Sequence, residues 1–246
     1  MTITATSRAA QADAYLNRLR ENAYPGRGIV IGMTPDGTRL VQVYWIMGRS
    51  ENSRNRVFIQ EESGFVRTEA KDPAKLTDPS LIIYYPAKHK DGKHIITNGD
   101  QTDTIYDELQ SGGTFESALN RRTYEPDAPN FTPRISGIVD LGDPQFAYKL
   151  SILKSSGNTE DQTLRHVYTY EKALPGFGHV IHTYEGNGNP LPSFQGEPQL
   201  VPLFDDAKQI ADTYWSLLNE ENKISLLVKT IRLDSGAAEL LIVNKD

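Results

Sequence analysis

The sequence predicts an α+β fold, because runs with strand character are numerous and few helical segments separate them. Short runs rich in Val, Ile and Tyr recur from residue 28 to residue 246, and most are bounded by Gly, Pro, Asn or Asp. Helical periodicity is confined to residues 9–22, 101–112, 114–122 and 204–220. A doubly wound α/β fold would need helices that alternate with strands, so the grouped helices favour α+β.

The N-terminal part predicts a helix followed by a hairpin. Residues 9–22 carry a narrow apolar stripe, and Pro25 and Gly26 end the pattern. Residues 28–33 and 39–47 have strand character. The sequence between them, TPDGT, predicts a turn, because Pro fixes φ and Gly accepts a positive φ.

The middle of the chain predicts four short strands and then two helices. The strands are expected at residues 55–62, 64–70, 81–89 and 93–99. Thr102 or Asp103 is the expected N-cap of the first helix, and Thr114 that of the second. Three prolines between residues 126 and 133 exclude a helix from the segment that follows.

The C-terminal half returns to strands. They are expected at residues 134–141, 145–153, 164–174 and 178–186. A Gly- and Pro-rich segment at 185–202 predicts a long surface loop, and residues 204–220 form the clearest amphipathic helix. Residues 224–233 and 238–246 are expected to pair as a hairpin across the sequence DSGA.

Composition excludes several classes of function. The 246 residues carry a net charge of −6, which argues against general binding of nucleic acid or of anionic membranes. With no cysteine, the chain has neither disulfides nor thiolate chemistry. The N-terminus lacks the apolar segment of a secretory signal, and no apolar run approaches the roughly 18 residues that span a bilayer. The expected location is the cytoplasm.

The five histidines do not indicate a metal site. His179 and His182 lie three residues apart on an expected strand, where they face opposite sides of the sheet. No helical H-x-x-x-H pattern and no acidic cluster accompanies them. We therefore expect no metal and interpret these side chains as exposed or hydrogen-bonded.

An arginine-rich break between two strands is the first candidate site. The sequence GRSENSRNR interrupts two apolar runs with Arg49, Arg54, Arg56 and two asparagines. Guanidinium groups bind phosphate and carboxylate oxygens in pairs, and amides can hydrogen-bond to a base edge. A solvated loop with surface ion pairs is the alternative interpretation. An anionic ligand needs only this local cluster and no positive net charge.

Two further polar segments are candidates. In IITNGDQTDTI, a strand ends at a tight Asn98–Gly99 turn and a helix begins, which is a geometry that can bind anions. In TYEPDAPNFTPRISG, Glu125 and Arg134 flank a stiff, proline-spaced path, where a carboxylate could act as a general acid or base. A plain turn with a helix cap and a plain surface connection are the respective alternatives.

These segments occur together, and in this order, in a known family. YPGRGI, GRSENSRNR, NGDQTDTI and YEPDAPNFTPRI resemble motifs of the archaeal-type IMP cyclohydrolases. The resemblance runs from about Tyr24 to about Gly137 and extends loosely to Tyr184 and Glu185. Ser53 and Arg54 depart from the family, which commonly has Phe-Pro there. Residues 1–23 lie before the family's usual start, so we expect an N-terminal helical extension and a single domain at 24–246.

The resemblance implies a fold and a reaction. The fold is a four-layered αββα core similar to that of the N-terminal-nucleophile hydrolases, without their autoprocessing. The reaction closes the ring of 5-formamidoimidazole-4-carboxamide ribonucleotide to give inosine 5′-monophosphate and water, the final step of purine biosynthesis. It implies no cofactor, and it implies a homo-oligomer, with a tetramer as one possibility. The alternatives are a purine-nucleotide-binding protein or another nucleotide amidohydrolase on the same fold.

The resemblance also assigns roles to residues. Arg56 matches the family's catalytic arginine, Tyr84 its catalytic tyrosine and Glu125 its catalytic acid, although the neighbouring Tyr85 leaves the tyrosine register open by one residue. The implied substrate-binding residues are Arg27, Ser53, Arg54, Asn55, Asn98, Gly99, Thr102, Asp103 and Arg134.

Overall fold

The computed structural model, which describes residues 5–157, 159 and 162–246, contains two antiparallel sheets. The first sheet has six strands, in the order β11 (Gln199–Pro202), β10 (Phe177–His182), β1 (Gly28–Met33), β2 (Arg39–Met47), β12 (Lys223–Arg232) and β13 (Ala238–Asn244). The second has seven, in the order β3 (Val57–Gln60), β4 (Val66–Glu69), β5 (Ala87–Lys90), β6 (Lys93–Thr97), β7 (Arg134–Asp140), β8 (Tyr148–Ser155) and β9 (Thr163–Tyr170). The predicted α+β class is confirmed.

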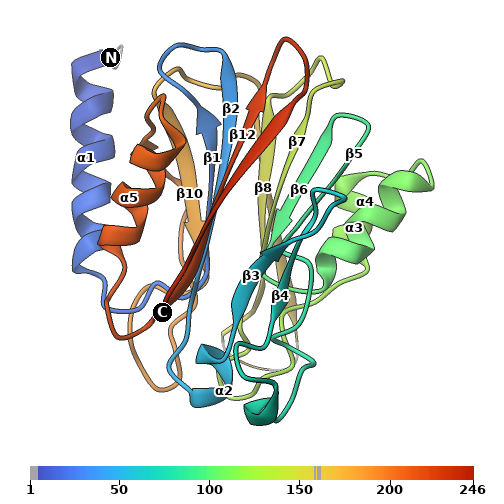
Figure 1. Ribbon diagram of the computed structural model, residues 1–246, viewed down its shortest axis with the longest axis vertical. Coiled ribbons are helices and arrows are strands. Elements are labelled where there is room, and N and C mark those ends of the chain that lie inside the picture. The colour runs from blue at the N-terminus through green and yellow to red at the C-terminus, as the bar shows by residue number, and fades with distance from the viewer. Residues whose placement is uncertain (1–4, 158, 160–161) are drawn as a thin grey trace.

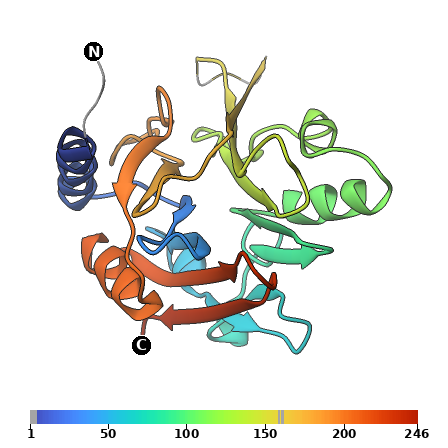
Figure 2. The same ribbon diagram turned by 90° about the horizontal axis from the view of Figure 1, so that it is seen from above.

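The sheets lie face to face, and helices cover their outer faces (Figure 1). Helices α1 (Ala5–Glu21) and α5 (Ala207–Leu217) pack on the first sheet, whereas α3 (Gln101–Gln110) and α4 (Phe115–Asn120) pack on the second. Viewed from above, β12 and β13 lie beside the β3–β4 hairpin (Figure 2). The helices thus cover the two outer faces and leave the space between the sheets to strand side chains.

Strand β2 shows how the sequence builds these layers. Val43 and Trp45 point into the apolar cluster beneath α1 and α5, while the intervening Tyr44 and Ile46 point into the cluster between the sheets. Both faces of β2 are therefore apolar, which explains why its sequence reads as a continuous apolar run instead of an alternating one. A third cluster, between α3, α4 and the second sheet, completes the core.

Most predicted elements are present with small changes at their ends. Residues 28–33 and 39–47 form β1 and β2 with the predicted bounds, and β12 pairs with β13 as predicted. Thr114 is the N-cap of α4, as predicted, and it also forms a capping box. Residues 9–22 fall within or beside α1.

Four predictions of local structure need correction. The strand expected at 81–89 begins only at Ala87, because the preceding residues turn between two prolines. The N-cap of α3 is Asp100, whose carboxylate pairs with arginines instead of capping the helix. The loop expected at 185–202 ends in β11. The arginine-rich break contains the short helix α2 (Glu51–Arg54), where the side chain of Ser50 accepts a hydrogen bond from the backbone of Ser53. A 3-10 turn, η1 (Pro73–Lys75), follows β4.

Candidate active site

Residues at the ends of several strands gather near α2, at one end of the space between the sheets. Arg27 directly precedes β1, and Arg56 lies between α2 and β3. Glu125 comes from the proline-spaced segment before β7. These three side chains and Tyr84 are close enough to shift one another's pKa, and all four are buried. The structure therefore brings together residues that are as many as 98 positions apart in sequence (Arg27 to Glu125).

Glu125 is a buried carboxyl group among cations. Only 1% of its surface is exposed, and Oε1 has no hydrogen-bond partner within the described part of the chain. Burial raises the pKa of Glu125 to about 7, although Arg27, Arg134 and Arg56 act in the opposite direction. A carboxyl group with a pKa near 7 can both accept and donate a proton at neutral pH.

Arg56 presents two free donors inside the protein. Its Nε donates to the carbonyl of Ser53 at 2.8 Å, which fixes the direction of the side chain. Nη1 and Nη2 have no partner among residues 5–157, 159 and 162–246. Burial lowers the pKa of Arg56, and the neighbouring Arg27 lowers it further. The unpaired edge of this guanidinium can hydrogen-bond to a developing oxyanion.

Arg27 is held beside Glu125 by a tight turn. Its backbone N–H donates to Thr183 Oγ1 at 3.1 Å. The preceding Gly26 has a φ of +74°, and a Cβ there would lie 2.2 Å from the same Oγ1, so only glycine fits. Burial alone would lower the pKa of Arg27, but Glu125 and nearby tyrosines raise it overall. Arg27 therefore remains a cation beside the buried carboxyl group.

The adjacent Tyr84 and Tyr85 point to different surroundings. Tyr84 is buried, and its hydroxyl shares a 2.7 Å hydrogen bond with that of Tyr44. Burial raises the pKa of Tyr84, although Arg56 and Arg27 lower it. In contrast, Tyr85 donates to Glu61 at 3.1 Å, and Lys88 Nζ lies 4.3 Å from its ring centroid. Of the two registers left open by the sequence, only that of Tyr84 places the phenol beside Arg56 and Glu125.

Arg134 and the turn at Gly99 form the wall next to Glu125. Arg134 donates to Gln101 Oε1 at 2.8 Å and pairs with Asp100 at 2.7 Å. A Cβ at Gly99 would lie 2.6 Å from Arg134 Nη1 and 3.4 Å from Glu125 Oε1. Gly99 thus allows the backbone to approach both charged groups closely.

The other predicted residues of this turn use their polar atoms within the protein. The amide of Asn98 accepts from the backbone of Ile135 and donates to the carbonyl of Pro133. Thr102 shares a hydrogen bond with Thr97, and Asp103 pairs with Lys88 at 2.6 Å on the side of Tyr85. Asn98 and Thr102 therefore hold the shape of the turn, and Asp103 lies apart from Glu125. Their contact with a substrate stays a prediction.

Apart from Arg56, the predicted site residues of the arginine-rich break are likewise engaged. Asn55 bonds through both ends of its amide to the backbone of Asp72. Ser53 donates to the carbonyl of Ser50. Arg54 donates to the carbonyl of Gly48 and to Asn222, so part of its guanidinium is engaged within the protein. Their proposed contacts with substrate also remain predictions.

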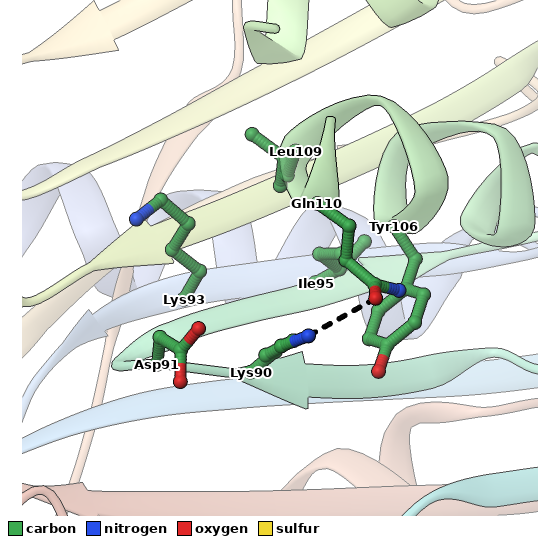
Figure 3. Close-up of a pocket in the computed structure, with 7 residues that line it drawn as sticks. All are labelled: Lys90, Asp91, Lys93, Ile95, Tyr106, Leu109 and Gln110. Atoms are coloured by element: carbon green, nitrogen blue, oxygen red, sulfur yellow. Dashed lines mark hydrogen bonds between the residues drawn. The ribbon is translucent and has the colours of Figure 1, made fainter. Parts of the chain in front are cut away.

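Two pockets illustrate the surroundings. A pocket of about 250 Å³ reaches Arg56 and is lined also by Arg54, Lys71, Glu221, Lys223, Ile224, Lys245 and Asp246. A smaller one of about 100 Å³ lies between the β5–β6 hairpin and α3, where Lys90 donates to Gln110 (Figure 3). None of the predicted site residues lines the smaller pocket. The cationic pocket is therefore the one connected to the candidate site.

The sequence assigned no role to several residues beside the cluster. Tyr184 and Thr132 share a hydrogen bond between their hydroxyls, and Thr132 also donates to Asp127. Tyr184 contributes to the charge environment of Arg27. The polar sequence His182-Thr183-Tyr184, at the end of a buried strand, was the available signal. Tyr44 gave none, because an aromatic residue within an apolar strand usually belongs to the core.

Within the described residues, no group of three or more His, Asp or Glu side chains could hold a metal ion, and no helix is long and apolar enough to cross a membrane.

His179 and His182 do face opposite sides of the first sheet, as predicted. His179 packs against Tyr170 toward the second sheet, and His182 bonds to Tyr15 of α1.

Comparison with known proteins decides the family. A sequence model of a family described as IMP cyclohydrolase-like protein matches residues 24–236. The chain belongs to this family. The match extends well beyond Gly137, where the motif-level resemblance ended, and it begins at Tyr24.

Two relatives from archaea carry the name of the enzyme. An IMP cyclohydrolase of Methanopyrus kandleri is 40% identical over 121 residues, which is 48% of this chain and 59% of that protein. An IMP cyclohydrolase of Methanococcus maripaludis is 30% identical over 129 residues, 51% of this chain and 62% of that protein. The chain thus matches less than two thirds of the length of either IMP cyclohydrolase.

Proposed function

We propose that this IMP cyclohydrolase-like protein is an IMP cyclohydrolase, which closes 5-formamidoimidazole-4-carboxamide ribonucleotide to inosine 5′-monophosphate with loss of water. The observation that carries the proposal is the cluster of Glu125, Arg56 and Arg27. In this buried cluster, Glu125 has a pKa of about 7 and an unpaired acceptor oxygen, and the arginines have unpaired guanidinium donors. Membership of the IMP cyclohydrolase-like family suggests the reaction, and these groups suit its chemistry.

The reaction needs a proton moved twice. The carboxamide nitrogen attacks the formyl carbon, a C–N bond forms, and the nitrogen loses a proton while the formyl oxygen gains one. The resulting carbinolamine then loses its hydroxyl group as water: the C–O bond breaks, the hydroxyl takes up a second proton, and the formamido nitrogen gives up its N–H proton as a C=N bond forms. Since an amide nitrogen is a poor nucleophile, holding it against the formyl carbon is the first requirement. Glu125 is suited to both proton transfers, because its carboxyl group is poised between its two protonation states near pH 7.

Arg56 and Tyr84 complete the proposed machinery. Negative charge develops on the formyl oxygen during attack, and the free Nη1 and Nη2 of Arg56 can stabilise it where water is excluded. Tyr84, which is oriented by Tyr44, can donate a hydrogen bond to the carboxamide or to the departing oxygen. Burial raises the pKa of Tyr84, so its hydroxyl keeps its proton and can act as a donor.

The cationic pocket beside Arg56 is the proposed place for the nucleotide phosphate. Arg54, Lys71, Lys223 and Lys245 line it, and clustered cations attract phosphate. Arg27, Asn98, Gly99 and Arg134 would shape the opposite wall around the base and ribose. In this arrangement, Ser53, Asn55 and Thr102 support the turns that carry these residues, and Asp103 lies at the margin.

The remaining features follow from the family resemblance. The two facing sheets with helices on both outer faces support an αββα core of the N-terminal-nucleophile hydrolase type, without autoprocessing. We further propose that residues 24–246 form a single domain and that residues 1–23 are an extension. We also propose that the protein is a homo-oligomer, with a tetramer as one option, and that it acts on a purine ribonucleotide in the cytoplasm.

Direct cyclisation tests the function. The purified protein should convert the formamido ribonucleotide to inosine 5′-monophosphate without added metal, as followed by absorbance. Arg56→Ala should lower kcat by at least about 10²-fold, because it removes the proposed oxyanion donors. The matched control is Arg67→Ala, since Arg67 pairs with Glu61 and Glu69 on the surface of the hairpin. Nucleotide binding without turnover would instead support a binding protein, and normal turnover by Arg56→Ala would remove its assigned role.

A further inference from the structure

Lys229 is a buried lysine with no protein partner. It lies in the middle of β12, and 1% of its surface is exposed. Its Nζ has no hydrogen-bond partner in the described part of the chain. Alternate residues of β12 point into the cluster beneath α1 and α5. Lys229 belongs to the other set, together with Leu227 and Ile231, and therefore points between the sheets. A buried ammonium group without a counter-ion is costly, which makes its retention in the core informative.

Two histidines face the same space with unused nitrogens. His94 on β6 is 3% exposed, and neither ring nitrogen has a partner among the residues described. His89 pairs with His94 in the β5–β6 hairpin, and their rings stack with centroids 5.6 Å apart. Nδ1 of His89 is also unpartnered. Burial lowers the pKa of both histidines and Lys229 lowers it further, so the three side chains lie near one another.

These side chains line a pocket separate from the candidate active site. The pocket has a volume of about 350 Å³, and its lining includes residues of β12, β13, β3, β5 and β6. Along β12, Lys229 is six residues from Lys223, which lines the pocket beside Arg56, so the Cα atoms of the two lysines are about 20 Å apart. Glu62, the one carboxylate among its lining residues, is exposed.

We propose that this Lys229 pocket binds a small free oxyanion of the phosphate or sulfate type. Such an anion supplies the missing charge partner for Lys229 and has enough acceptor oxygens to satisfy its N–H groups. Neutral His94 and His89 can each donate one ring N–H to the same anion. The pocket is roomy enough for a tetrahedral oxyanion together with water. Nothing in the proposed cyclisation uses this cluster, so the site is an addition to the proposed function.

A thermal-shift titration with inorganic phosphate tests the proposal. At a phosphate concentration about ten times Kd, the melting temperature of the unmodified protein should rise by roughly 3–5 °C relative to chloride at equal ionic strength. Lys229→Met should remove most of this rise, because it removes the charge while keeping most of the length of the side chain. Lys223→Met is the matched control in the pocket beside Arg56, where phosphate also binds in the proposed function, and it should keep most of the rise.

The outcomes separate the alternatives. A rise that is lost in Lys223→Met but kept in Lys229→Met would place phosphate beside Arg56 and overturn the proposal, as would the absence of any rise. NMR of the unmodified protein gives a second readout, in which phosphate should shift the ring resonances of His94 and unchanged resonances would contradict the site. Inosine 5′-monophosphate shows whether the Lys229 pocket binds a free oxyanion or the phosphate of a nucleotide. If Lys229→Met leaves the rise in melting temperature caused by the nucleotide intact, the pocket binds a free oxyanion. If that rise is lost, the proposal of a free oxyanion is wrong. A failed cyclisation assay affects none of these results.

Discussion

The hydroxyl groups of Tyr44 and Tyr84 share a hydrogen bond of 2.7 Å across the space between the two sheets. Tyr44 belongs to β2 of the first sheet, and Tyr84 precedes β5 of the second. The backbone N–H of Tyr84 is in turn fixed by Thr68 Oγ1 at 2.9 Å. Tyr84 is therefore held from two directions, which orients its phenol beside Arg56.

Replacement of Tyr84 by Phe should lower kcat by about 10²-fold, because the proposed hydrogen-bond donor is lost. The hydroxyl of Tyr44 would also lose its partner in a buried place, and this should reduce the free energy of unfolding by about 1–3 kcal/mol. Steady-state kinetics and urea denaturation measure the two effects separately. Tyr85→Phe is the matched control: it removes only a part-buried contact with Glu61 and should leave kcat within about twofold. Equal losses in both variants would contradict the proposed role of Tyr84.

Glu125 should make the stability of the protein depend on pH in a defined window. Its pKa is about 7 in the folded protein, compared with 4.5 as the ordinary value. The folded state therefore binds this proton more tightly, so the stabilisation is fully present below pH 4.5 and is lost as the pH rises to 7. The loss amounts to about 3 kcal/mol for a shift of this size. Glu125→Gln is neutral at every pH and should remove this contribution.

The measurement is the difference in unfolding free energy between the unmodified protein and Glu125→Gln across this window. A difference is needed because buried histidines act in the opposite direction. Burial lowers the pKa of His179 and His182 to about 4, so their neutral forms favour folding as the pH rises. Those contributions are common to both proteins and cancel. A difference that stays constant with pH would mean that Glu125 titrates normally in the folded state.

Gly99→Ala should impair both activity and stability. The added Cβ would lie 2.6 Å from Arg134 Nη1 and 2.7 Å from Gln101 Oε1, which are both the ends of flexible side chains. Both side chains are buried and hydrogen-bonded to each other, so moving them aside should reduce the free energy of unfolding by about 1–3 kcal/mol. The displaced Arg134 would alter the wall beside Glu125 and lower kcat/KM by about tenfold or more. Gly37→Ala is a useful comparison, since its Cβ meets nothing within 4 Å and its cost comes only from the positive φ of a distant turn. Unchanged kinetics of Gly99→Ala would contradict a role for this wall.

The sequence predicted the strands better than the chemistry between them. Residues 28–33 and 39–47 are unambiguous because both faces of these central strands are buried, and a continuous apolar run between turn residues indicates such a strand. The segment before β5 was mistaken for a strand because Ile82, Tyr84 and their neighbours have strand character. Its backbone instead bonds to the side chain of Thr68, and this tertiary contact overrides local preference.

The candidate site was predictable only where polar residues interrupt an apolar pattern. Arg56 and Glu125 stand out in this way, whereas Tyr44 and Lys229 lie inside strands and look like ordinary or exposed strand residues. Which neighbours they meet depends on how the two sheets are aligned, and that pairing joins segments far apart in sequence. Periodicity places a side chain on one face of its own strand, but it carries no information about the facing sheet.

The N-terminal helix should contribute to the stability of the domain, although the family match begins only at Tyr24. Leu19 of α1 is 2% exposed and belongs to the cluster beneath α1 and α5. Leu19→Ala should lower the free energy of unfolding by about 2–4 kcal/mol, as measured by urea denaturation, because it leaves a cavity in that cluster. Leu233→Ala is the matched control, since Leu233 is 44% exposed and its truncation should cost less than about 0.5 kcal/mol. Similar small costs for both variants would mean that α1 rests on the domain without stabilising it. A large cost for Leu19→Ala alone would make the helix part of the same cooperative unit, because its packing energy would then be lost in the same transition that unfolds the sheets.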